Sequence, residues 1–178
     1  MAAWSRGLPA CCFSMAGGKG TRLHGLWGEP KCLVPVGGVP LLERIFRLLR
    51  PITDRRNQCV CVFGHGAQSC WDFLDELWRR EEHQNFGLSS ICETGGTHKA
   101  VRRALVHLNG PVLVLNGDTL PLYSLQELIV AHELLEHPWA TAATARVNKH
   151  PTFAGAVVLS PEAVEEIKGD TRTYDFAA

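Results

Sequence analysis

The strongest constraint on the fold is an uninterrupted apolar run at residues 111–115, Pro-Val-Leu-Val-Leu. A strand with one face in water alternates apolar and polar residues, whereas a run without alternation is expected for a strand covered on both faces. Further β-prone runs at 10–15 and 58–63 are separated from it by segments whose apolar residues recur with helical spacing. Strands that alternate with helices predict right-handed crossovers and a mostly parallel sheet between two layers of helices, an α/β architecture.

Local signals place the remaining elements. Helices are predicted at 40–50 and 67–80, after Thr97, after Ser124 and after Ser160, and further strands at 88–92, 139–147 and 154–159. Pro40 is expected as the first residue of the first helix, and Pro161 as that of the last. Ser124 and Glu127 form a capping box, and the helix that follows them is expected to carry Leu135 on its apolar face.

The chain has 178 residues, which fits a single domain at 1–178, and no linker, repeat or low-complexity tract divides it. Its formal net charge is zero, so no basic field attracts nucleic acid or an anionic membrane, and no apolar run is long enough to span a bilayer. The seven cysteines form neither a zinc pattern nor a paired C-x-x-C pattern. We therefore expect a reduced, cytoplasmic protein with small-molecule partners, and a homo-oligomer is left open.

A glycine-rich segment follows the first predicted strand. Residues 16–22 read Ala-Gly-Gly-Lys-Gly-Thr-Arg. Glycines let bare backbone N–H groups approach an anion, and Arg22 adds a bidentate charged donor, so the segment suits a phosphate chain. An ordinary glycine-rich turn fits the same spacing. Two standard phosphate loops are excluded, because G-x-x-x-x-G-K-[S/T] is absent and G-x-G-x-x-G requires glycine where Leu23 stands.

Asp118 directly follows the run at 111–115 and its Asn116-Gly117 end. If the first strand and this one are neighbours, the glycine-rich segment and Asp118 face one crevice beyond the carboxyl ends of the strands. A carboxylate there would repel a phosphate unless Mg²⁺ lies between them; alternatively, Asp118 forms an Asx turn. Lys31 could place a compact positive charge on a phosphate, or be an ordinary solvated lysine.

Residues 16–42 resemble the first signature of the sugar-1-phosphate nucleotidyltransferases, the enzymes that make nucleotide sugars. That signature is A-G-G-x-G-T-R-L followed by P-K-x-L-x-P-V-x-G-x-P-L-L, and almost every fixed position is filled. Residues 112–119 resemble the second signature of the family. Residues 93–101 resemble its E-P-L-G-T-x-x-A-L segment, with Thr94-Gly95 in place of Pro-Leu and Lys99 in place of a frequent glycine.

The resemblance implies a Rossmann-like three-layer fold and a Mg²⁺-dependent reaction, in which an NTP and a sugar 1-phosphate give an NDP-sugar and pyrophosphate. In the family, the arginine of G-T-R-L binds the leaving pyrophosphate and the lysine of P-K-x-L contacts the reacting phosphates. These catalytic roles fall on Arg22 and Lys31, and the metal-binding role of the second signature falls on Asp118. The implied nucleotide-binding residues are Ala16, Gly17, Gly18, Gly20, Thr21, Glu93, Gly96 and Thr97.

The resemblance covers residues 10–168 and thins toward the C-terminus. Residues 148–152 pass directly to a strand at 153–160, so the chain is expected to lack the sugar-binding hairpin of the family and its last strand, which carries a second metal-binding aspartate. Two alternatives to a sugar-1-phosphate transferase therefore stay open. One is a guanylyl- or cytidylyltransferase that acts on a small non-sugar phosphate, and the other is a non-catalytic nucleotide-binding regulatory module.

Overall fold

The structure is a computed structural model that describes residues 10–14, 28–53, 57–80, 87–136 and 138–170 of the chain. Within these ranges no helix has the length and apolar character needed to cross a bilayer.

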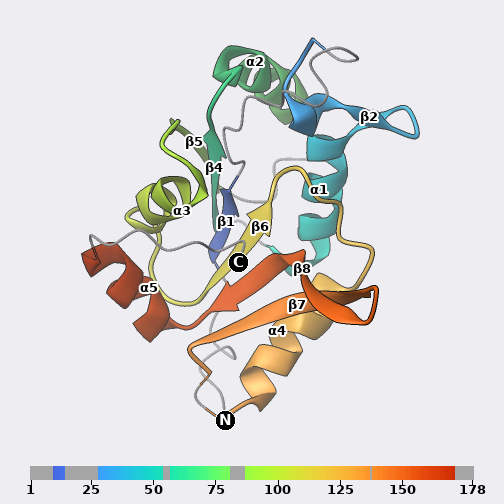
Figure 1. The fold of residues 1–178 in the computed structure, drawn as a ribbon. Helices are drawn as coiled ribbons and strands as arrows, with labels where there is room; N and C mark the ends of the chain where they lie inside the picture. The colour runs from blue at the N-terminus through green and yellow to red at the C-terminus, as the bar shows by residue number, and fades with distance from the viewer. Residues whose placement is uncertain (1–9, 15–27, 54–56, 81–86, 137, 171–178) are drawn as a thin grey trace.

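Six strands form one sheet in the order β5-β4-β1-β6-β8-β7 (Figure 1). Their bounds are Ala10–Ser14 for β1, Gln58–Phe63 for β4, Gly87–Cys92 for β5, Val112–Asn116 for β6, Ala140–Val147 for β7 and His150–Leu159 for β8. The four strands from β5 to β6 are parallel, whereas β8 runs antiparallel to both β6 and β7. The predicted α/β fold with a mostly parallel sheet is confirmed, and the antiparallel part is a hairpin at one edge.

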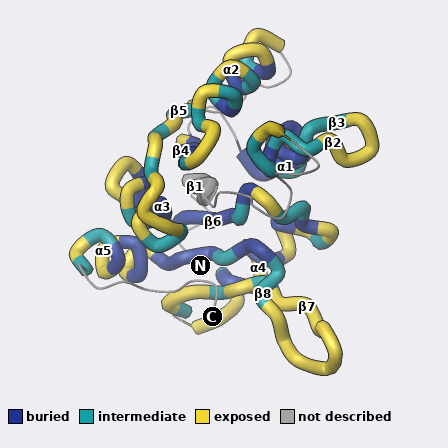
Figure 2. The backbone as a smooth tube through the Cα atoms, turned by 45° about the horizontal axis from the view of Figure 1, so that its top comes forward, coloured by how far each residue is buried: buried dark blue, intermediate teal, exposed yellow. Residues whose placement is uncertain are grey.

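In the described ranges five α-helices pack on the two faces of this sheet: α1 Leu41–Leu49, α2 Ala67–Trp78, α3 Thr97–Leu105, α4 Leu125–Leu134 and α5 Pro161–Gly169. Two 3₁₀ turns, Lys31–Leu33 and Arg50–Ile52, and a small sheet of β2 Pro35–Val36 and β3 Val39–Pro40 complete the described elements. One hydrophobic core lies between the sheet and α1, α2 and α4, and a second lies between the sheet and α3 and α5. The described elements thus form three layers, and buried residues lie along β6 and β8 and on parts of the helices that cover them (Figure 2).

Strands β4 and β6 are buried on both faces, which confirms the prediction made for β6. In β6, Leu113 and Leu115 enter the first core, while Val112 and Val114 enter the second. Burying a leucine fully stabilises the folded state by roughly 1.5–3 kcal/mol relative to leaving it exposed. Strands with side chains in both cores therefore contribute to the stability of both.

The helix boundaries differ from the predictions at three places. Pro40 lies outside α1, because its extended backbone (φ −52°, ψ 140°) ends β3 and the helix begins at Leu41. At the other end, residues 50–52 form a 3₁₀ turn that contains Pro51. Leu135 is not part of the apolar face of α4, because the helix ends at Leu134 and Leu135 is extended and 53% exposed.

The predicted starts of β7 and β8 also differ from the structure. β8 begins at His150 rather than at 154, and Trp139 precedes β7 instead of starting it. Val147 pairs with His150, so Asn148 and Lys149 form a two-residue hairpin turn. Their φ values are 49° and 67°, which is the positive range that tight hairpin turns of this length require.

We expect the substitution Lys149→Gly to stabilise the protein. A left-handed backbone conformation costs a residue with a Cβ roughly 1 kcal/mol, and glycine adopts it without this cost. Urea unfolding should therefore give a free energy of unfolding about 0.5–1 kcal/mol higher than that of the parent. Lys149→Val should lower it, because a β-branched residue fits this backbone worst. A stabilising Lys149→Val would contradict the described turn.

Candidate functional site

The carboxyl ends of β1 and β6 lie side by side. The two strands are parallel neighbours, with Ser14 opposite Asn116, so whatever follows them starts at the same edge of the sheet. This confirms the prediction that the first strand and the strand at 111–115 are neighbours in the sheet. The glycine-rich segment, with its predicted residues Ala16, Gly17, Gly18, Gly20, Thr21 and Arg22, lies outside the described residues.

Lys31 and Asp118 meet at this edge. The Lys31 Nζ lies 3.8 Å from the Asp118 Oδ2, and the two side chains are 40% and 52% exposed. An exposed pair at this distance contributes about 0–1 kcal/mol to stability, so folding does not depend on it. The pair instead places one cationic and one anionic group, both open to solvent, beyond the ends of neighbouring strands.

A short turn fixes the backbone of Lys31. The N–H groups of Leu33 and Val34 donate to the carbonyls of Pro30 and Lys31 at 2.9 and 3.1 Å. The neighbouring Cys32 is buried, and its Sγ lies 3.5 Å from the Sγ of Cys70 on α2. The hydrogen bond with Cys70 and burial both raise the pKa of the Cys32 thiol, so it stays protonated and acts as an anchor.

Pro30, at the start of the same turn, packs against the residue that precedes α2. Gly66, which precedes α2 with φ 77°, lies so close to Pro30 that a Cβ on it would stand 2.6 Å from the proline Cγ. Glycine is therefore required here both for its backbone and for the close approach.

Asp118 is held from the other side by β8. Its Oδ1 lies 3.4 Å from the Thr119 hydroxyl, which donates to it. Thr119 packs against Gly155 of β8, where φ is 86° and an added Cβ would stand 2.8 Å from the threonine Cγ2. The Tyr123 hydroxyl donates to the Ala154 carbonyl at 2.9 Å, which ties the segment after Asp118 to the same part of β8.

Glu93 follows β5 and organises the entry to α3. Its Oε1 accepts a hydrogen bond from the Gly95 N–H at 2.7 Å, and its Oε2 forms an ion pair with Arg103 at 3.3 Å. The Gly95 hydrogen bond above all, together with Arg103, lowers the pKa of the Glu93 carboxyl. Both oxygens thus have partners within the protein, and the nucleotide-binding role implied for Glu93 stays a prediction beside the alternative of an ordinary glutamate before a helix.

The predicted residues divide into two groups at one edge of the sheet. Lys31 and Asp118 lie together next to β6, whereas Glu93, Gly96 and Thr97 lie at the end of β5 and the start of α3. Gly96 has φ 97°, so its glycine is needed for the turn that starts α3. Their binding roles stay predictions.

Sequence reasoning passed over His65. This exposed histidine sits in the turn that follows β4, between Gly64 and Gly66, at the same carboxyl edge. A polar residue that follows a glycine at the end of an apolar strand is the signal that singled out Asp118, and it could have found His65 as well.

Comparison with known proteins assigns the chain to a family. A family model described as a MobA-like NTP transferase domain matches residues 13–178. Among curated proteins, the bifunctional protein GlmU of Gloeobacter violaceus is 36% identical over 164 residues, which are 90% of this chain and 30% of that protein. The GlmU of Trichormus variabilis is 32% identical over 161 residues, or 88% of this chain and 33% of that protein. The chain thus spans about a third of these two relatives.

Solved structures share the fold. The inositol-1-phosphate CTP transferase of T. maritima superposes with a TM-score of 0.69 at 13% identity, over 96% of this chain and 78% of that one. A putative glucose-1-phosphate thymidylyltransferase from Bacillus anthracis gives 0.65 at 17% identity, over 93% and 76%. HddC from Yersinia pseudotuberculosis gives 0.62 at 19% identity, over 96% and 84%. The Rossmann-like fold of nucleotide-diphospho-sugar transferases is thereby established for this chain.

We expect Gly155→Ala to destabilise the protein and to displace Thr119. The new Cβ meets Thr119 at below 3 Å and must hold φ at 86°, which together cost roughly 1–3 kcal/mol. Gly169→Ala is the matched control, because nothing lies within 4 Å of its added Cβ. Thermal unfolding should show a lower midpoint for Gly155→Ala and a near-parental one for the control. Equal midpoints would contradict the described contact.

Proposed function

The chain belongs to the MobA-like NTP transferase domain family, and we propose that it transfers a nucleoside monophosphate from an NTP to a sugar 1-phosphate, releasing pyrophosphate. The observation that carries the proposal is the approach of Lys31 and Asp118 to 3.8 Å at the carboxyl edge shared by β1 and β6. In open α/β sheets this edge is where ligands bind.

The donor set at Asp118 fits Mg²⁺. In the described ranges no three His, Cys, Asp or Glu residues gather as a metal site. Mg²⁺, however, is commonly bound by one or two carboxylates and completes its shell with phosphate oxygens and water. The Asp118 carboxylate is 52% exposed and can accept such a role. When bound there with the nucleotide, the metal would neutralise phosphate charge.

Positioning and charge neutralisation would supply most of the catalysis. An oxygen of the acceptor phosphate attacks the α-phosphorus in line with the departing pyrophosphate, and no covalent enzyme intermediate is needed. The Lys31 ammonium group donates hydrogen bonds to the phosphate oxygens that gain negative charge. Arg22 and the glycines before it would hold the β- and γ-phosphates. Glu93 would act indirectly, by shaping the turn that presents Gly96 and Thr97 to the nucleotide.

The acceptor defines the second candidate function. The similar solved structures include both a putative glucose-1-phosphate thymidylyltransferase and an inositol-1-phosphate CTP transferase. A small non-sugar phosphate is therefore the alternative acceptor on the same site. We place the protein in the cytoplasm, a location that the free thiols of Cys32, Cys61, Cys70 and Cys92 favour.

Asp118→Asn tests the metal site. The substitution keeps the shape of the side chain and removes its charge. Because the side chain is exposed, we expect the free energy of unfolding to stay within about 0.5 kcal/mol of the parental value. We also expect Mg²⁺-dependent pyrophosphate release to fall at least about a hundredfold. Asp72→Asn, on the exposed face of α2, is the control with parental turnover. Parental turnover by Asp118→Asn would overturn the assignment.

Lys31→Ala separates an enzyme from a binding module. We expect NTP affinity by isothermal titration to stay within a few fold, while pyrophosphate release with sugar 1-phosphates falls about a hundredfold, the effect of removing a preorganised charge. Lys168→Ala on α5 is the matched control, since its partner is the surface residue Glu165.

The parent protein provides the decisive comparison. A panel of NTPs should be tested against sugar 1-phosphates and against inositol phosphate. Turnover with the non-sugar acceptor alone would favour the alternative acceptor. Nucleotide binding without pyrophosphate release from any pair would show that the chain is a binding module and not an enzyme.

A further inference from the structure

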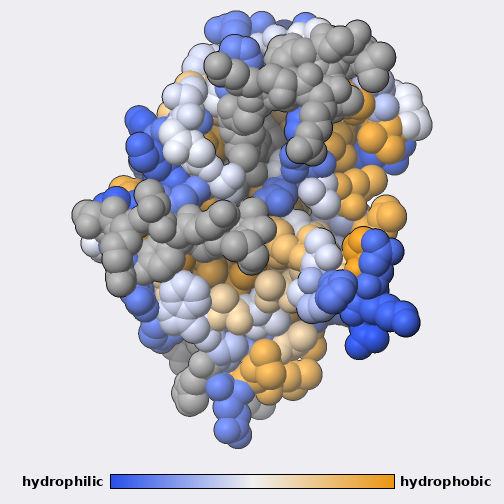
Figure 3. Space-filling model, in the orientation of Figure 1, coloured by the Kyte–Doolittle hydropathy of each residue, from blue (hydrophilic) through white to orange (hydrophobic). Residues whose placement is uncertain are grey.

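The side chain of Lys99 lies on the turn that connects β5 to α3. A Cβ added to Gly95 would overlap the Lys99 Cδ and stand 3.3 Å from its Cε, so the stem of the lysine rests on the bare Cα of the glycine. Lys99 is the third residue of α3, and both it and Gly95 are exposed. Figure 3 shows mostly hydrophilic side chains over the start of this helix. Lys99 is thus part of the surface that the turn presents.

The contact joins two of the positions at which this segment departs from the family pattern. The pattern E-P-L-G-T-x-x-A-L has leucine where Gly95 stands and frequently glycine where Lys99 stands. In this chain the bulk comes from position 99 and the space from position 95, so the two departures compensate each other. The exchange also replaces an apolar side chain with one that ends in an ammonium group, which is a charged hydrogen-bond donor.

The stability of α3 does not explain this charge. A helix dipole disfavours a cation in the first turn, and α3 has no acidic residue there. The pKa of the nearby Glu93 carboxyl is lowered first by the Gly95 hydrogen bond, and also by Arg103 and Lys99. Among the residues that the structure describes, however, the Glu93 carboxylate is engaged by the Gly95 N–H and by Arg103, and no ion pair holds the Lys99 ammonium group. That group is therefore available to a ligand that accepts hydrogen bonds.

Sheet order sets the distance from this turn to the phosphate end of the candidate site. Lys31 and Asp118 lie beyond the end of β6, whereas the turn at 93–97 follows β5, three positions away in the order β5-β4-β1-β6. Neighbouring strands are about 4.8 Å apart, so the two strand ends are separated by roughly 14 Å. An extended nucleoside triphosphate covers such a span. With its phosphates at Lys31 and Asp118, its base lies at the turn beside Lys99.

We propose that Lys99 selects the base of the nucleotide, an inference that rests on the proposed function. The ammonium group has donors only, so it binds a carbonyl oxygen on the edge of the base. Guanine, uracil and thymine present a carbonyl oxygen at the edge position where adenine and cytosine present an amino group. An amino group is itself a donor and is repelled by the ammonium group. The donor substrate is therefore an NTP with a keto base, and ATP and CTP are disfavoured.

Isothermal titration with Mg²⁺ and each of four NTPs measures this preference in matched pairs, GTP against ATP and UTP against CTP. In at least one pair, the parent protein should bind the keto nucleotide at least about tenfold more tightly, the discrimination of a single good base contact. Lys99→Met keeps an unbranched stem on Gly95 and removes the donor, so the two members of that pair should bind with nearly equal affinity. Lys99→Arg keeps a charged donor and should retain the preference.

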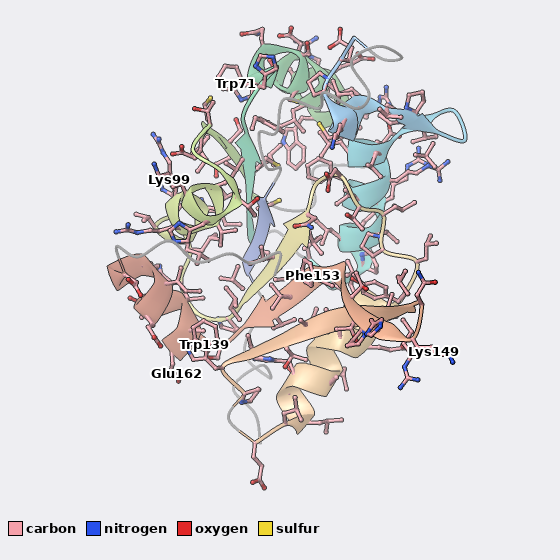
Figure 4. All side chains as sticks on the ribbon, viewed as in Figure 1. Trp71, Lys99, Trp139, Lys149, Phe153 and Glu162 are labelled. Carbon is pink, nitrogen blue, oxygen red and sulfur yellow. The ribbon has the colours of Figure 1, made fainter. Side chains whose placement is uncertain are left out.

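Lys149→Met is the matched control, because it removes an exposed lysine on the opposite side of the molecule from Lys99 (Figure 4). It should bind all four NTPs as the parent does, and thermal unfolding of every variant should match the parent. A parent that shows no preference for the keto nucleotide in either pair overturns the role of Lys99, as does a Lys99→Met variant that keeps the parental ratio. Both results leave the proposed transfer intact, because pyrophosphate release measures it separately. A parent that binds none of the four NTPs overturns both.

Discussion

Parallel pairing of β1 with β6 is the constraint on which the candidate site depends. Parallel strands end at the same edge of a sheet, so this pairing brings the segment after Ser14 and the segment after Asn116 together although they are far apart in the chain. β4 and β5 extend the edge, which adds His65 and Glu93 to it. The polar groups of the site are thus brought together by sheet order, although they come from segments far apart in the chain.

The two described charges of the site are positioned by buried and close-packed neighbours. Lys31 is exposed, but Cys32 beside it is buried against Cys70, and Pro30 packs on Gly66. On the other side, Asp118 is next to Thr119, which fits against Gly155. An exposed ion pair is too weak to organise a loop. Apolar packing therefore fixes the backbone, and the charged side chains remain available for a ligand.

The hairpin of β7 and β8 supports the carboxyl edge of the sheet from one side. This edge carries Lys31 and Asp118, the described groups suited to phosphate chemistry. Gly155 of β8 packs against Thr119, the neighbour of Asp118, and Ala154 accepts a hydrogen bond from Tyr123. A change at Gly155 is therefore expected to reach the Asp118 segment through Thr119.

The sequence by itself determined the α/β layering, the strand at 58–63, the doubly buried β6, and the caps at Ser124 and Ser160, whose hydroxyls accept the N–H groups of Glu127 and Ala163. These are local patterns, and a few adjacent residues suffice to specify them. The tertiary structure alone decided that β8 begins at His150, that Leu135 is exposed, and that the carboxylate of Glu93 is held by Gly95 and Arg103. It also decided the 3.8 Å approach of Lys31 to Asp118. Each of these depends on where a helix ends against its neighbours or on which distant segments pack together, and no local pattern encodes such contacts.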